Sequence, residues 1–104
     1  MPASGQSVDG VAVDAASAER AQQAVEATVP PGMRIGTPRL TTLQWCGDTL
    51  VADLSENYAD VPFTVGSVDA LKAQLAAAVG RSAAPVALSI GGNDIECYFT
   101  RYDN

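Results

Sequence analysis

The chain has 104 residues, enough for one domain with a modest hydrophobic core. A hydrophobic fraction of 47% and a charged fraction of 17% are typical of a globular protein and exclude an intrinsically disordered one. Twelve acidic residues against six basic residues give a net charge of −6, which disfavours a nucleic-acid partner because phosphate binding depends on clustered Lys and Arg.

Residues 1–7 are expected to form a flexible N-terminal tail, and residues 8–104 a single α+β domain. The tail lacks the basic start and the apolar centre of a signal peptide. The protein is therefore either cytoplasmic, or its signal sequence is not part of this chain. No apolar run approaches the roughly 20 residues that a membrane-spanning helix needs, so we do not expect the chain to span a membrane.

A short strand and a helix are predicted after the tail. Valines alternate with polar residues over residues 8–13, which indicates a weak strand. Residues 15–28 carry small apolar side chains at helical spacing on one face, and Asp14 stands before them as an N-cap. The helix is expected to end at Pro30, because proline cannot continue it.

Two strands joined by a tight turn are predicted next. Residues 34–44 form one strand-like run, the sequence Cys-Gly-Asp at residues 46–48 reverses the chain, and residues 49–54 form a second run. Pro38 lies within the first run and indicates an edge strand or a bulge, because proline has no N–H to donate to a neighbouring strand. Residues 56–63 are expected to form a loop.

A second helix follows this loop. It is expected to begin at Ser67 or Asp69, since apolar residues then recur at helical spacing, and to end at Gly80. The apolar run at residues 86–90 predicts the next strand.

The sequence Gly91-Gly92-Asn93-Asp94 comes after that strand. A glycine-rich segment can cradle a phosphate, but this one lies between two strand-like runs rather than before a helix, so we expect a hairpin turn. Apolar residues alternate over residues 95–99 and predict a last strand. The element order is therefore β-α-β-β-α-β-β, which predicts an α+β fold with an antiparallel sheet and two helices on one face.

The order of motifs from Ala27 to Cys97 resembles a known family. A helix is followed by Val-Pro-Pro-Gly at residues 29–32 and a strand, and a second strand ends in Asp-Leu-Ser at residues 53–55. A loop, a helix and a strand that closes on two glycines come next. This arrangement resembles the GerMN-type domain of spore-germination and sporulation proteins. Residues 54–99 are also similar to the domain that precedes the catalytic region in xanthan-lyase or amidase-like secreted bacterial proteins.

This resemblance implies a location and a role. GerMN-type domains are similar to the ring-building domains of bacterial envelope assemblies, and the family implies an extracytoplasmic accessory or interaction domain. The expected location is therefore the periplasm, the cell envelope or the exterior, with the signal sequence outside this chain. The family supplies no catalytic residue, and the Asp-Leu-Ser motif at residues 53–55 is expected to end a strand and start the following loop.

The chain contains no histidine, which removes the commonest general base and the commonest metal ligand. We therefore expect no catalytic residue, no metal site and no cofactor. Asp53, Glu56 and Asp60 could converge as carboxylates for acid–base chemistry or as a calcium site, but their spacing matches no EF-hand loop. They are expected to be solvated surface charges.

Two cysteines, Cys46 and Cys97, lie 51 positions apart, which is neither a zinc-site spacing nor a redox motif. One interpretation is a disulfide that joins the turn of the central hairpin to the last strand. Such a bridge would indicate an oxidising compartment. The other interpretation is a pair of reduced thiols, with one or both buried as small apolar side chains.

Three aromatic residues are candidates for contact with a partner protein: Trp45, Tyr98 and Tyr102. Trp45 stands at the predicted hairpin turn, where it either anchors a partner or covers the edge of the core. On a final strand, Tyr98 and Tyr102 would share the face opposite Cys97, forming either an exposed aromatic strip or a partly buried one.

These observations favour a non-catalytic extracytoplasmic domain that binds another protein or serves as an accessory module. One alternative is a small hydrolase that uses Asp53, Glu56 or the thiolate of Cys46. Another is a self-assembling subunit whose exposed edge strand, next to Pro38, pairs with a neighbouring copy.

Overall fold

The computed structural model describes residues 11–101. The tail at residues 1–7, the first part of the predicted strand at residues 8–13, and Tyr102 lie outside this range. The described elements run in the order β2 (Val11–Ala12), α1 (Ala15–Glu26), β3 (Leu40–Cys46), β4 (Thr49–Leu54), η1 (Glu56–Asp60), α2 (Val65–Ala78), β5 (Val86–Ile90), β6 (Asn93–Asp94) and η2 (Ile95–Arg101). The predicted α+β class is confirmed.

The strands of the described region form one sheet in the order β2-β3-β4-β5-β6. Neighbouring strands are antiparallel except β4 and β5, which run parallel with Leu50 opposite Val86 and Leu54 opposite Ile90. The prediction of an entirely antiparallel sheet was therefore wrong. The chain leaves β4 through η1 and α2, and this crossover is long enough to return β5 in the same direction.

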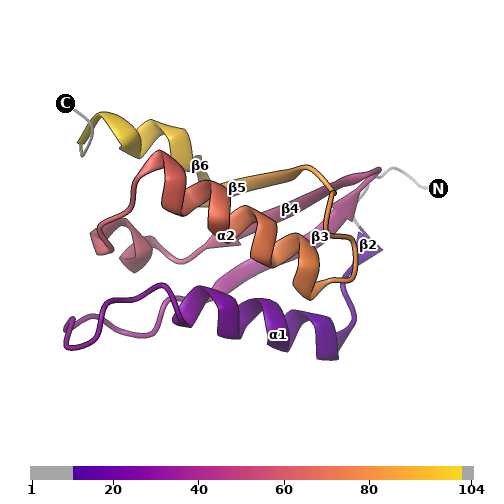
Figure 1. The fold of residues 1–104 in the computed structure, drawn as a ribbon, viewed down its shortest axis with the longest axis horizontal. Helices are drawn as coiled ribbons and strands as arrows, with labels where there is room; N and C mark the ends of the chain where they lie inside the picture. The colour runs from indigo at the N-terminus through magenta and orange to yellow at the C-terminus, as the bar shows by residue number, and fades with distance from the viewer. Residues whose placement is uncertain (1–10, 102–104) are drawn as a thin grey trace.

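Both α-helices lie on one face of the sheet, as predicted (Figure 1). α1 begins after Asp14, whose carboxylate accepts a hydrogen bond of 3.1 Å from the N–H of Ser17. α2 begins at Val65, two residues before the earliest predicted start, because Thr64 and Ser67 form a capping box. In it the N–H of Ser67 donates to Thr64 Oγ1 at 3.1 Å, and the N–H of Thr64 donates to Ser67 Oγ at 2.8 Å.

The hydrophobic core lies between the sheet and the two helices. Every second residue of β4 points into it, and Leu50, Ala52 and Leu54 are fully buried. The helices, η1, β5 and η2 supply the rest of the buried cluster, which comprises Ala21, Val25, Tyr58, Val61, Phe63, Val68, Leu71, Leu75, Leu88, Ile90 and Ile95. The alternate residues of β4 therefore point away from the helices.

The strand predicted at residues 34–44 is shorter than expected, because β3 begins only at Leu40. Just before β3, the backbone forms hydrogen bonds with a side chain of α1 instead of with a neighbouring strand. The amide of Gln22 donates to the carbonyl of Pro38 at 2.7 Å, and its oxygen accepts from the N–H of Leu40 at 2.9 Å. Since Pro38 has no N–H, strand pairing starts after it.

The last predicted strand, at residues 95–99, was also wrong. After the turn, only Asn93 and Asp94 pair with β5, and the chain then forms the 3-10 helix η2. The carboxylate of Asp94 accepts a hydrogen bond of 2.8 Å from the N–H of Glu96 and so closes the first turn of η2. Ile95 is buried, and Tyr98 and Phe99 pack partly buried against the core. The apolar residues that suggested a strand therefore lie in η2, which packs against the core.

Candidate functional site

One face of the sheet is covered by no helix among the described residues. We call this surface the open face, and it consists of the side chains that alternate with the buried ones along β2 to β5. Most of its members are small: Ala12, Thr42, Gln44, Thr49, Val51, Asp53, Ala87 and Ser89. The sheet therefore presents a flat surface with few long side chains.

Asp53 lies near one end of the open face and joins three strands. Its Oδ1 accepts hydrogen bonds from Ser89 Oγ at 2.5 Å and from the N–H of Gly92 at 2.8 Å, and its Oδ2 accepts one from Thr41 Oγ1 at 2.6 Å. Burial raises the pKa of Asp53, but the hydrogen bonds from Ser89, Thr41 and Gly92 outweigh it and hold the pKa below its usual value of 3.8. Asp53 is therefore an ionised cross-link rather than a proton donor.

Asp53→Asn is expected to lower the free energy of unfolding by about 1 kcal/mol at neutral pH, because an amide oxygen accepts weaker hydrogen bonds than a carboxylate. The folded-state pKa is depressed, so this stabilisation is fully present above the ordinary pKa of 3.8 and is lost as the pH falls through the folded-state value. Urea unfolding of both proteins from neutral to strongly acidic pH measures the difference, which should shrink at the acidic end.

The exposed residue Asp60 provides the control for this experiment. Asp60→Asn removes the same charge without removing such a network, so its effect on stability should stay within about 0.5 kcal/mol. A difference between Asp53→Asn and the wild type that is equally large at strongly acidic pH would contradict the ionised cross-link.

Asp53, Glu56 and Asp60 are not gathered into one site. Glu56 and Asp60 stand at the two ends of η1 and are exposed, while the oxygens of Asp53 are bonded to its own network. Within residues 11–101, no three side chains of the types His, Cys, Asp or Glu form a group that could hold a metal ion. These three carboxylates therefore do not converge on a common calcium site or acid–base site in the structure.

The glycine turn after β5 is a hairpin turn, as predicted. Gly91 and Gly92 have φ values of 57° and 86°, which are left-handed conformations that glycine adopts readily. The N–H of Gly91 donates to the carbonyl of Leu54 at 2.7 Å, and the N–H of Gly92 donates to Asp53. Because both N–H groups are already bonded within the protein, the turn offers neither of them to a phosphate.

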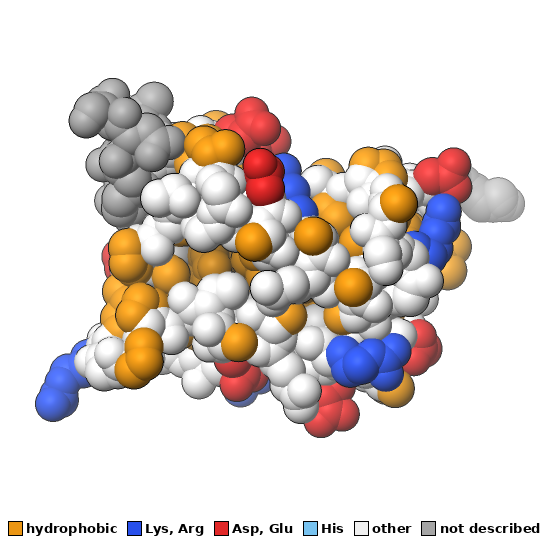
Figure 2. Space-filling model, in the orientation of Figure 1, with side chains coloured by type: hydrophobic (Ala, Val, Ile, Leu, Met, Phe, Trp, Pro, Cys, Tyr) orange, Lys and Arg blue, Asp and Glu red, His pale blue; other side chains and the backbone are white. Residues whose placement is uncertain are grey.

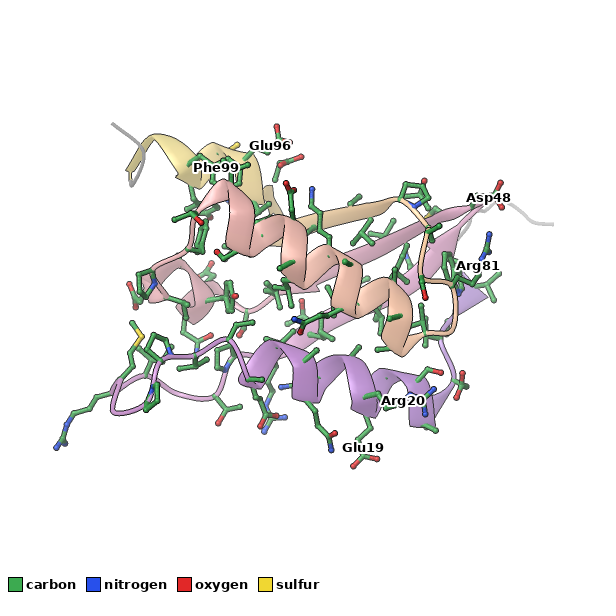
Figure 3. The ribbon with its side chains drawn as sticks, in the orientation of Figure 1. Glu19, Arg20, Asp48, Arg81, Glu96 and Phe99 are labelled. Atoms are coloured by element: carbon green, nitrogen blue, oxygen red, sulfur yellow. The ribbon has the colours of Figure 1, made fainter. Side chains whose placement is uncertain are left out.

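Of the two interpretations of Cys46 and Cys97, the disulfide is not formed, and both residues are free thiols. Both are exposed, so the expected burial of one or both thiols is also wrong. Cys46 is paired with Thr49 at the start of β4, whereas Cys97 follows the turn beside the end of β4, about 16 Å away along the strand. In Figure 3, Asp48 lies at the right end of the molecule, and Glu96 and Phe99 lie well to its left, along the top. A disulfide needs Cα atoms within about 7 Å, so the fold keeps the two thiols apart.

Trp45 covers the edge of the core rather than standing free at the hairpin turn. It is partly buried against the core, on the same side of the sheet as its partner Leu50. The guanidinium of Arg81 lies over its ring, 4.6 Å from the ring centre, and also pairs with Asp48 at 3.5 Å. Figure 3 shows Asp48 and Arg81 close together at this end of the molecule. Trp45 thus has an intramolecular partner on one ring face.

Tyr98 is half-buried and faces the core, and its hydroxyl donates to the carbonyl of Ile90 at 3.2 Å. Its neighbour Phe99 packs edge-on against Phe63, with ring centres 6.1 Å apart. The aromatic strip predicted for Tyr98 and Tyr102 assumed a final strand, which η2 replaces, and Tyr102 lies outside the described residues.

The sequence did not identify the partners of Asp53. Thr41 and Ser89 lie on different strands, and only the pairing register brings them to Asp53, which stands opposite Thr42 and Ser89. One signal was available, because Ser89 is the only polar residue in the run Val-Ala-Leu-Ser-Ile at residues 86–90.

No helix of the described region is long and apolar enough to cross a membrane. No protein-family model, no curated protein and no solved structure matches the chain. The likeness to the GerMN-type domain therefore stays a prediction from the sequence.

Proposed function

We propose that this chain is a non-catalytic, extracytoplasmic accessory domain that binds another protein through the open face of its sheet. The observation that carries the proposal is the open face itself, since both α-helices pack on the opposite side and leave these side chains uncovered among the described residues. Val51 and Ala87 form an apolar pair near its middle, and polar side chains flank them.

The chemistry of the open face suits protein binding. Its small side chains, such as Thr49 and Ala87, lose little rotamer entropy when a partner covers them, so the cost of ordering the interface is low. Asp53 and Ser89 are already fixed by their hydrogen bond, which makes this end of the face rigid before a partner arrives.

The alternative of a small hydrolase draws less support from the structure. Asp53 has a lowered pKa and gives its oxygens to three donors, which makes it a poor proton carrier near neutral pH. Cys46 pairs with Thr49 at the other end of β4, so the two candidate groups do not meet.

The alternative of a self-assembling subunit requires an open strand edge near Pro38. In the structure, the side chain of Gln22 bonds the carbonyl of Pro38 and the N–H of Leu40. A register shift between β3 and β4 follows at Leu40 to Thr42. Within residues 11–101, the edge strands β2 and β6 have two residues each. Short edges, a bulge and a proline are the features by which proteins avoid edge-to-edge pairing. We therefore favour a different protein as the partner.

The extracytoplasmic location rests on the resemblance to the GerMN-type domain alone, because the free thiols remove the support that a disulfide would have given.

Ala87→Glu is expected to abolish partner binding, because it places a charge and a long side chain beside Val51 on the open face. The control is Ala73→Glu, which makes the same change at an exposed position of α2, in the other layer of the fold. Each immobilised protein is incubated with the extracytoplasmic fraction of the source cells, and the retained proteins are identified.

The wild type and Ala73→Glu should retain the same protein, and Ala87→Glu should not. Retention by all three proteins would contradict binding through the open face. A parallel incubation uses the cytoplasmic fraction, and a partner retained from that fraction alone would contradict the location.

A further inference from the structure

A small cavity of about 190 Å³ lies at the end of α1, away from the open face. It is lined by residues of α1 and of the segment between α1 and β3: Glu26, Val29, Ile35, Thr37 and Pro38. In Figure 2, hydrophobic side chains gather at the left end of the molecule, where this segment lies. The volume is below the roughly 300 Å³ typical of small-molecule pockets, so it suits a single side chain of a larger partner.

The walls of the cavity are held in place by hydrogen bonds. The amide of Gln22 donates both to the carbonyl of Pro38 at 2.7 Å and to Oε2 of Glu26 at 3.0 Å. The amide of Asn57 donates to the carbonyl of Gly36 at 2.6 Å, which ties the outer part of the segment to η1. The cavity is therefore formed before any ligand enters.

The cavity combines apolar walls with one carboxylate, that of the exposed Glu26. Arg34 and Arg39 lie on the segment after α1, within the described range, and neither forms an ion pair with Glu26. Val29, Ile35 and Pro38 supply the apolar surface. Glu26 is the last residue of α1, where the helix dipole is negative, and the last turn of α1 contains no basic residue. Within residues 11–101, Glu26 forms no ion pair, and its Oε1 has no hydrogen-bond partner.

We propose that this cavity binds the side chain of a lysine or an arginine presented by a partner protein. Such a side chain has an aliphatic stem, which would lie along Val29 and Ile35, and a cationic head, which would reach the carboxylate of Glu26. The net charge of −6 adds a long-range attraction for a basic partner. A purely apolar side chain would leave Glu26 facing it without a counter-charge.

This site is separate from the open face, because α1 and the segment after it form the cavity. The two proposals therefore fail independently. A partner that requires the open face but ignores the cavity would leave the proposed function intact.

The test is an NMR titration of the uniformly ¹⁵N-labelled chain with two short peptides. One is acetyl-Gly-Lys-Gly-amide, and the other carries Nε-acetyl-lysine, which keeps the stem and removes the charge. We expect saturable shifts of the backbone amides of Val29, Ile35 and Thr37 with the first peptide. Affinity for the second should be at least about tenfold weaker, which corresponds to the loss of one charge-assisted contact.

Glu26→Gln should weaken binding of the lysine peptide by the same factor, while the side chain still accepts the hydrogen bond from Gln22. The control is Glu19→Gln, which removes an equal charge from an exposed position on α1 that points away from the body of the molecule (Figure 3). It should bind like the wild type. Equal affinity for the two peptides, unchanged binding by Glu26→Gln, or shifts that do not saturate would each overturn the proposal.

Discussion

Leu54→Ala is expected to lower the free energy of unfolding by about 3 kcal/mol, the typical cost of removing a fully buried leucine and leaving a cavity. Leu54 is fully buried and ends β4, the middle strand of the sheet, between Leu40 on one side and Ile90 on the other. In a domain of this size the melting temperature should fall by about 15 °C. Thermal and urea unfolding, followed by circular dichroism, measure both quantities.

The matched control is Val65→Ala, which also removes an apolar side chain, but from a residue that is 48% exposed at the start of α2. Its effect should be below about 0.5 kcal/mol. If Leu54→Ala were no more destabilising than Val65→Ala, the side of β4 that faces the helices would have been assigned wrongly.

Gly91→Ala is expected to cost about 2 kcal/mol, for two separate reasons. The backbone at Gly91 has a φ of 57°, a left-handed conformation that costs an L-residue about 1 kcal/mol. A Cβ at this position would also lie 2.7 Å from Cγ of Glu56, which would have to move. Gly92 has a φ of 86° but no atom within 4 Å of its ideal Cβ, so Gly92→Ala tests the backbone part alone.

A double-mutant cycle separates the two contributions at Gly91. Glu56→Ala removes the Cγ atom that a new Cβ would meet. The combination with Gly91→Ala should therefore be about 1 kcal/mol more stable than the sum of the single effects predicts. Strict additivity would mean that η1 and the turn after β5 do not approach each other as described.

Local patterns in the sequence were sufficient to predict most of the helices and strands. Asp14 is correctly predicted as the N-cap of α1, and the turn at residues 46–48 correctly joins β3 to β4. These features depend on contacts between near neighbours in the chain, which a sequence shows directly. The end of α1 was placed too late, because the helix ends at Glu26 rather than at residue 28.

The direction of β5 was not predictable in the same way. The segments on either side of it suggested hairpins, and the sequence was therefore interpreted as an antiparallel sheet. The crossover through α2 returns the chain to the start of β4, where Val86 pairs with Leu50, so β5 runs parallel to β4. The direction of a strand therefore depends on contacts between distant parts of the chain, and a short stretch of sequence does not reveal it.

The error at residues 95–99 has a simple physical cause. Ile95, Cys97 and Phe99 alternate as in a strand, but Ile95, Tyr98 and Phe99 are also spaced as on a helix. A short run cannot distinguish the two periods. In the structure Ile95 is buried, Tyr98 and Phe99 are partly buried, and Cys97 is exposed. This burial pattern follows helical spacing rather than strand alternation.

The Asp53 network shows the limit of motif reasoning for the candidate site. The Asp-Leu-Ser motif was correctly expected to end a strand. Its carboxylate also bonds Thr41 and Ser89, and these contacts depend on the register of three strands. The expectation of a solvated surface charge was therefore too simple, because Asp53 cross-links the sheet.

The most direct test of the open face as a binding surface is site-specific photo-crosslinking in the source cells. A photoreactive amino acid replaces Ala87 on the open face or, as the control, Ala73 on α2, both of which are exposed. The proposal predicts one defined adduct with another protein from position 87 and none from position 73. The absence of an adduct from position 87, or the same adduct from both positions, would contradict it.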